Sequence, residues 1–215
     1  MILTPRLRRF SLLAHVTFSV GWLGSIVGYL ALAIAGLTSQ DAPLARSAYI
    51  SMELLGWAVI VPFSLAALLS GLVQSLGTEW GLFRHYWILV KLVLAVGATI
   101  ILLLHMSVVS HMSGVARETT FSSGDFGTIR IQLVVHGVGG FLVLLTATAL
   151  SIYKPWGMTS YGRRKRQEIA APSVGLSRTS VSGTRWGTYA MFGIVGLILL
   201  FLILHHLLGG GLSHH

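Results

Sequence analysis

The sequence predicts an all-α fold: a polytopic membrane helical bundle of about five transmembrane helices, with a four-helix core and one further C-terminal helix. Of the 215 residues, 54% are hydrophobic and only 10% are charged, whereas a soluble domain carries roughly 25% charged residues. The chain therefore lacks the polar residues that cover a globular surface in water. The apolar residues also fall in blocks of the roughly 20 residues that a helix needs to cross a bilayer.

Five apolar blocks are long enough to span the membrane with some tilt. They run from Phe10 to Gly36, Glu53 to Leu76, Tyr86 to Val109, Ile131 to Tyr153 and Trp186 to Leu208. We therefore expect a four-helix transmembrane core in 1–154 and a basic cytoplasmic loop in 155–185. The remaining residues, 186–215, are expected to form the fifth transmembrane helix and an extracytoplasmic tail.

Three local features refine this expectation. Pro62 predicts a kink near the middle of the second span, because proline lacks the amide hydrogen and its ring crowds the preceding turn. Gly24 and Gly28 form a small-residue pair that favours close helix packing on the first span. Gly140, with the glycines just before it, opens a groove near the start of the fourth span, which suits either close packing or a flat cofactor.

The basic residues predict the orientation, because lysine and arginine accumulate in cytoplasmic loops. With the N-terminus in the cytoplasm, the outer loops hold only Arg46, Arg117 and Arg130. The cytoplasmic set is Arg6, Arg8, Arg9, Arg84, Lys154, Arg163, Arg164, Lys165, Arg166, Arg178 and Arg185. Eleven residues against three predict a cytoplasmic N-terminus, an external C-terminal tail and a location in the cytoplasmic membrane.

Composition also excludes several function classes. The chain contains no cysteine, which removes disulfides, iron–sulfur clusters and thiol nucleophiles. The net charge of +9 follows the membrane topology, so nucleic acid is not an expected partner. The phosphate-loop, dinucleotide-binding, zinc-protease and serine-hydrolase motifs are all missing from the sequence.

Ionisable residues inside the predicted spans are the candidate site residues, because a charge is costly in lipid. Counting about 1.5 Å per residue from the span ends places His15 and Lys91 in the inner leaflet. The same count places His105 and His136 at matched depth in the outer leaflet. His85 lies near the inner end of the third span.

The outer pair leads to the main hypothesis, a haem b held between His105 and His136 as iron ligands. Two histidines at equal depth on consecutive helices can present imidazole nitrogens to opposite faces of one iron, without any cysteine. Gly140, one turn after His136, keeps the same face open. His15, Lys91 and His85 are expected to form a second polar site, either another haem site or a path for protons or substrate.

Copper is the alternative metal. His-Met pairs repeat at the outer end of the third span, and thioether with imidazole suits Cu(I). The residues concerned are Met106, His111 and Met112, in addition to His105. A copper transport or resistance protein would use this outer set. A permease or a non-catalytic partner subunit is the third possibility.

Two stretches carry a resemblance to known families. The first span contains His15-Val-Thr-Phe-Ser-Val-Gly-Trp22-Leu-Gly24, and the third contains Trp87-Ile-Leu-Val-Lys91-Leu-Val-Leu94. They resemble the HemJ-type protoporphyrinogen oxidases and the CopD-like copper-resistance membrane proteins. With the Thr78 to Trp87 stretch, the chain also looks like an uncharacterised integral membrane family of actinobacteria and bacilli.

The resemblance implies a four-helix core able to bind b-type haem, with His15 and Lys91 on the oxidase family's characteristic positions and Trp22 in the opening motif. His105 falls about one turn later than the resemblance implies. We therefore expect a haem b-binding membrane protein, with one haem or two, that carries electrons or acts as an oxidoreductase in the membrane. Its expected partners are membrane lipid, a quinone or redox partner protein, and a second copy of the chain.

Overall fold

The computed structural model describes residues 3–77, 85–118, 127–153 and 158–164. Within these ranges the chain forms four long helices that are apolar enough to cross a membrane. The spans are α1 (Pro5–Thr38), a continuous helix from Ala42 to Gly77, α4 (Tyr86–Arg117) and α5 (Gly127–Tyr153). The all-α membrane bundle is therefore confirmed. The predicted fifth helix and most of the basic loop lie outside the described residues.

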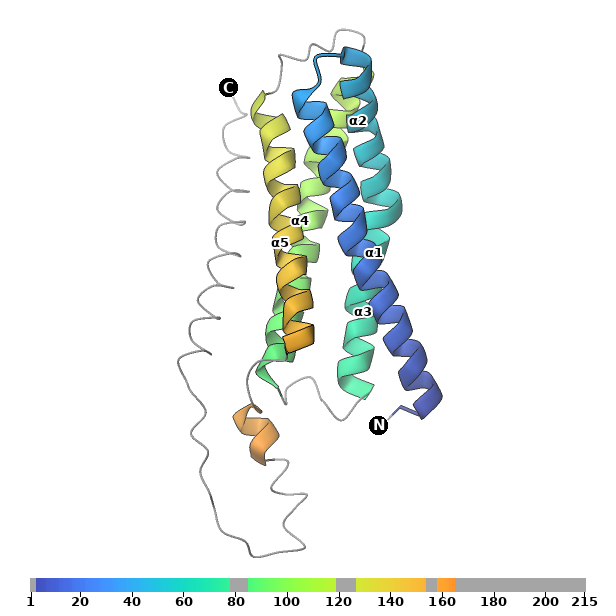
Figure 1. The fold of residues 1–215 in the computed structure, drawn as a ribbon, viewed down its shortest axis with the longest axis vertical. Helices are drawn as coiled ribbons and strands as arrows, with labels where there is room; N and C mark the ends of the chain where they lie inside the picture. Colours follow the sequence, from blue (N-terminus) through green and yellow to red (C-terminus); the bar gives the residue numbers. More distant parts are fainter. Residues whose placement is uncertain (1–2, 78–84, 119–126, 154–157, 165–215) are drawn as a thin grey trace, which may run out of the picture.

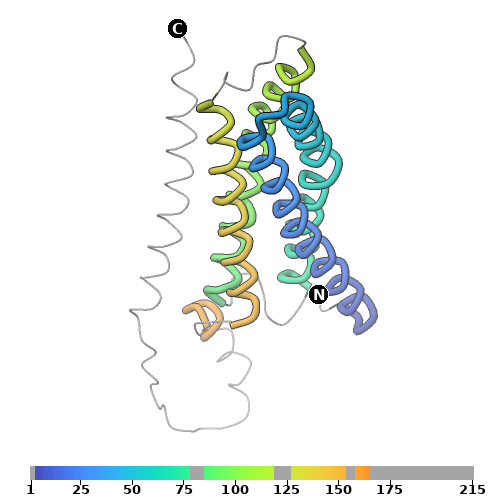
Figure 2. Tube along the Cα trace, turned by 45° about the horizontal axis from the view of Figure 1, so that its top comes forward, coloured from blue at the N-terminus to red at the C-terminus, as the bar shows by residue number. Residues whose placement is uncertain are grey.

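The four spans form an antiparallel bundle (Figure 1; Figure 2). The helix α1 packs against both halves of the second span and against α5, and α4 packs against the same two neighbours. The helices α1 and α4 therefore stand at opposite corners of the bundle. Any direct link between these two helices must cross its centre.

The bundle has the surface expected of a protein dissolved in lipid. Large apolar side chains point outward, and Phe10, Leu13, Leu69 and Ile152 are between 62% and 71% exposed. On a water-soluble protein such a surface would promote aggregation. Inward-facing residues recur every three or four positions, as on α1, where the buried side chains include Trp22, Ile26, Tyr29 and Ala33.

The second span begins at Ala42, eleven residues before the predicted start at Glu53. Its first half, α2 (Ala42–Leu55), carries Arg46 and two serines, Ser47 and Ser51, that break the apolar run. The helix forms nevertheless, because Ala45, Tyr49 and Met52 follow one another at helical spacing and are buried. The outer ends of α4 and α5 likewise extend beyond their apolar blocks.

The second span is interrupted by a π-helical turn, η1 (Gly56–Ile60), before α3 (Val61–Gly77) continues it. The amide of Val61 donates to the carbonyl of Gly56, five residues earlier. The turn directly precedes Pro62, whose ring crowds the carbonyl four residues back, and a wider turn relieves that crowding. The irregularity predicted from Pro62 is therefore a local widening of the helix.

The glycines that allow close packing differ from the predicted pair. A Cβ at Gly24 would meet nothing within 4 Å, and one at Gly28 would make only an ordinary contact. Close approaches occur instead at Gly21, against Phe63, and at Gly36, against Tyr49. The spacing of Gly24 and Gly28 thus indicated the wrong face of α1.

Arg130 was predicted in an outer loop, but it is a buried residue of α5, only 7% exposed. Its Nη2 donates to the carbonyls of Gly36 (2.6 Å) and Leu37 (3.0 Å), and its Nε donates to the Tyr49 hydroxyl (2.8 Å). The last carbonyls of a helix have no partner within the helix and carry a partial negative charge. Arg130 therefore caps α1 and fastens it to α2 and α5.

We expect Arg130→Met to destabilise the bundle by about 3 kcal/mol, because buried carbonyls lose a charged donor. Unfolding in a detergent titration measures the change. Arg117→Met is the matched control: Arg117 is exposed and pairs with Glu53 at 3.3 Å, so its loss should cost at most about 1 kcal/mol. Equal effects of the two substitutions would contradict the capping role.

The absence of native cysteine allows the orientation to be tested directly. With the predicted cytoplasmic N-terminus, a single cysteine introduced as Ser39→Cys, between α1 and α2, should react with a membrane-impermeant maleimide from outside intact cells. Thr4→Cys, just before α1, should react only after the membrane is permeabilised. The reverse labelling pattern would invert the topology.

Candidate functional site

The inner polar site joins α1 to α4 across the bundle. The Nζ of Lys91 lies 3.2 Å from the Nε2 of His15. On its other side, His15 Nδ1 lies 3.0 Å from the carbonyl oxygen of Ala67 and 3.2 Å from the hydroxyl of Ser70. A carbonyl only accepts, so Nδ1 carries the hydrogen and Nε2 has the lone pair that faces Lys91.

Residues of α3 surround and orient the His15 ring. A Cβ at Gly71 would stand 3.0 Å from the ring carbon Cε1, so a larger residue there would press on the imidazole. Ser70 in turn donates to the carbonyl of Ala66 at 2.6 Å, which holds its hydroxyl beside His15. The orientation of His15 is thus fixed by α3, while Lys91 approaches from α4.

The outer polar site consists of two stacked histidines and a tyrosine. The rings of His105 on α4 and His136 on α5 have centroids 4.3 Å apart and planes only 7° from parallel. The Tyr29 hydroxyl on α1 lies 3.0 Å from His105 Nε2. His136 Nδ1 donates to the carbonyl of Gln132 at 3.0 Å, so its Nε2 has the lone pair.

The structure brings together each pair that depth counting placed in one leaflet, but the two pairs differ in geometry. Nitrogen ligands on opposite faces of one metal point at each other, and metal–imidazole bonds of about 2 Å separate them by about 4 Å. The outer imidazoles are stacked face to face, which is not this arrangement. In the inner pair the two nitrogens face each other at 3.2 Å, about 1 Å closer than the separation of two ligands on one metal.

The donor chemistry of the inner site also fits a metal-bound cofactor. A metal-ligating histidine almost always donates its second ring N–H to a carbonyl, carboxylate or water, which fixes the ring and the free lone pair. His15 does so to Ala67. Lys91, as a neutral amine, is a second nitrogen donor, and metal binding displaces its proton. The residues present at the inner site therefore fit a haem iron better than the outer pair does.

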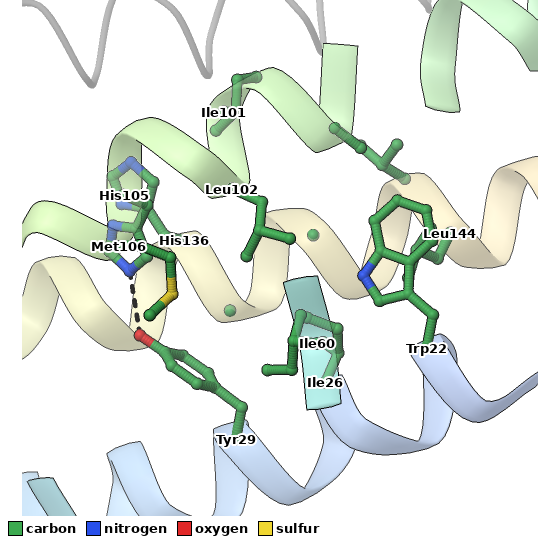
Figure 3. Close-up of a pocket in the computed structure, with 14 residues that line it drawn as sticks. Trp22, Ile26, Tyr29, Ile60, Ile101, Leu102, His105, Met106, His136 and Leu144 are labelled. Atoms are coloured by element: carbon green, nitrogen blue, oxygen red, sulfur yellow. Dashed lines mark hydrogen bonds between the residues drawn. The ribbon is translucent and has the colours of Figure 1, made fainter. Parts of the chain in front are cut away.

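A cavity lies at the centre of the bundle beside the outer site (Figure 3). Tyr29, His105 and His136 close one end of it, Trp22 lines the other, and apolar side chains of all four spans make up the walls. The lining residues are Trp22, Ile26, Tyr29, Ile60, Ala98, Ile101, Leu102, His105, Met106, His136, Gly137, Gly140, Val143 and Leu144.

The size of the cavity excludes a tetrapyrrole in its present shape. About 50 Å³ is open to the centres of water molecules. One water needs about 10–15 Å³ on this measure, so the cavity has room for about four waters, or on the order of 120 Å³ of liquid. That is the size of a single six-membered ring. Gly140 borders this space, because a Cβ there would reach only Ile26, 4.0 Å away.

The predicted copper ligands do not converge. Met106 and Met112 are each 1% exposed and belong to the hydrophobic core, whereas His111 lies on the exposed face of α4. Met106 packs against Gly56 of the π-helical turn. His85, predicted with the inner site, precedes α4 and forms an isolated β-bridge with Met158. Its ring centroid lies 6.5 Å from that of Trp87.

Sequence reasoning missed Tyr29 and the role of the Trp22 N–H. A signal was present on α1, where His15, Trp22, Tyr29 and Gly36 follow one another at intervals of seven residues. Seven residues are 20° short of two helical turns, so these positions share one face. The residues of this face meet Lys91, the cavity, His105 and Arg130 in turn.

Comparison with protein-family models, with curated proteins and with solved structures gave no significant match. The fold and the two sites define a multi-pass α-helical membrane protein with buried polar groups at two levels of the bundle. The resemblance to the HemJ-type oxidases and CopD-like proteins therefore stays a prediction based on the quoted residues.

We expect Tyr29→Phe to lower the stability of the bundle by about 1 kcal/mol, the usual worth of one buried hydrogen bond. Detergent unfolding measures the change, with Tyr153→Phe as control, since Tyr153 is 81% exposed. In a double-mutant cycle with His105→Ala, the two effects should fail to add, because both remove the same bond. Additive effects would show that the contact contributes nothing.

Proposed function

We propose that this protein binds haem b in the membrane, where His15 and Lys91 would hold the iron, and that it transfers electrons within the bilayer. The observation that carries the proposal is the facing of His15 Nε2 and Lys91 Nζ across the bundle at 3.2 Å. The proposed location is the cytoplasmic membrane.

Three further features support the inner pair as ligands. The Ala67 carbonyl holds His15 in the tautomer that a metal requires. Gly71 leaves room for the imidazole, because a Cβ there would stand 3.0 Å from its Cε1. His15 and Lys91 are also the two positions that the resemblance to the oxidase family implies.

When bound, haem supplies one-electron oxidation and reduction at its iron. The protein would supply the ligands and the apolar surroundings. The apolar bundle keeps water from the iron and lowers the local dielectric, which tunes the reduction potential. His15 is oriented by α3, and Lys91 must release its proton to bind, so haem binding should weaken at low pH.

The wild-type protein, purified in detergent from cells with an adequate haem supply, should show a Soret band and a dithionite-sensitive α band. His15→Ala and Lys91→Ala should each abolish the low-spin bands or lower the haem content by about tenfold or more, because each removes a ligand. The absorption spectrum and the haem-to-protein ratio are the measurements.

His111→Ala is the control, since His111 is exposed on α4. His105→Ala and His136→Ala should leave the bands in place. Loss of the bands in these two variants, with unchanged spectra for His15→Ala and Lys91→Ala, would show that His105 and His136 are the ligands instead. A colourless wild-type protein would overturn haem binding altogether.

A further inference from the structure

The cavity at the centre of the bundle is lined by the indole of Trp22, which is a buried hydrogen-bond donor. Trp22 is 4% exposed, and its indole Nε1 is buried with no hydrogen-bond acceptor among the described residues. Figure 3 shows the nitrogen edge of the indole turned toward the interior of the cavity. A buried N–H without an acceptor costs about 1–3 kcal/mol, so a ligand that supplies an acceptor gains affinity there.

The opposite end of the cavity differs in chemistry. It presents the Tyr29 hydroxyl and the stacked imidazoles of His105 and His136. Hydroxyl and imidazole can each donate or accept a hydrogen bond, whereas an indole N–H only donates. A ligand that fills the cavity therefore needs an acceptor at the Trp22 end. At the other end it can carry either a carbonyl or a hydroxyl.

A ring with two carbonyls on opposite sides has the chemistry that the two ends of the cavity require. One oxygen of a para-benzoquinone can accept a hydrogen bond from the Trp22 N–H, and the other can face the Tyr29 hydroxyl and the imidazoles. The walls between the ends are apolar, and the cavity has the size of one ring.

We propose that this cavity binds the head ring of a lipid-soluble quinone, with one carbonyl oxygen accepting a hydrogen bond from Trp22 Nε1. The hydroxyl and imidazoles at the far end suit both the carbonyl of the quinone and the hydroxyl of the quinol. Ile101, Leu102 and Gly140 line the cavity and are partly exposed on the outside of the bundle, which gives an apolar tail a way out to the lipid.

Only the role of the quinone as an electron partner rests on the proposed function. His15 lies two turns from Trp22 on the same face of α1, about 10 Å along the helix. A quinone in the cavity would therefore stand beside a haem held by His15 and Lys91, and would be its electron partner. As a binding site, the cavity stands on Trp22 and on its own shape.

The test measures how much decylubiquinone the detergent-purified full-length protein retains at equilibrium. Trp22→Phe keeps the ring and removes the N–H, and it should weaken binding by roughly 2- to 12-fold. Gly140→Leu should abolish binding, because its side chain occupies the cavity. Trp57→Phe is the matched control: Trp57 is 50% exposed and donates to Ser110, away from the cavity.

A decyl-substituted ring of the same size without carbonyls provides a second comparison. The wild-type protein should bind this analogue about as weakly as Trp22→Phe binds the quinone. Equal affinity of wild type and Trp22→Phe for decylubiquinone, or unchanged binding in a folded Gly140→Leu variant, would overturn the proposal.

The haem content of the same preparations separates the two proposals. Quinone binding that depends on Trp22 in a protein without haem bands would leave the cavity assignment standing and remove the proposed electron transfer. Haem bands in a protein whose quinone retention does not depend on Trp22 or Gly140 would leave haem binding standing and remove the cavity assignment. The melting temperature of each variant shows that it is folded.

Discussion

The structure depends on one constraint: inside a bilayer, a buried polar group finds its partner within the protein or remains without one. The bundle meets this constraint mainly through α1. His15 reaches Lys91, Tyr29 reaches His105, and the last carbonyls of α1 reach Arg130. The first two links cross the centre of the bundle to α4, the helix at the opposite corner, so they fix the depth of one helix relative to the other.

Among His15, Trp22, Tyr29 and Gly36, Trp22 is the residue whose polar group has no partner among the described residues, and its position explains why it differs. The residue stands between two satisfied links and borders a cavity that Ile60 of the π-helical turn and Gly140 of α5 also line. An open space and a donor without an acceptor occur at the same place, a combination that is more typical of a binding site than of a packing fault.

Much of the fold follows from the sequence, because the length of an apolar block and its spacing are local properties. The pairing of His15 with Lys91 and of His105 with His136 follows from the same regularity: a constant rise per residue turns sequence position into depth. The direction in which each ring points does not follow. The position of His105 depends on Tyr29, and the facing of His15 toward Lys91 depends on Ala67 and Gly71, all of which are tertiary neighbours.

Other differences from expectation have the same origin. The helix that begins at Ala42 contains Arg46, Ser47 and Ser51, which break the apolar run before Glu53, although its buried face is continuous. Arg130 was counted as a loop charge, because no local pattern shows that the end of α1 lies beside it. The assignment of cofactor and partner to these residues remains a prediction that the sequence and the geometry jointly support.

The π-helical turn at Gly56–Ile60 amounts to one additional residue in an otherwise regular helix. Each residue of a helix advances its side chains by about 100° around the axis. A chain shortened by one residue here would keep α2 in place and rotate all of α3 by that angle. Ala67 and Ser70 would then move away from the ring of His15. The π-helical turn beside the central cavity therefore sets the alignment of the inner polar site.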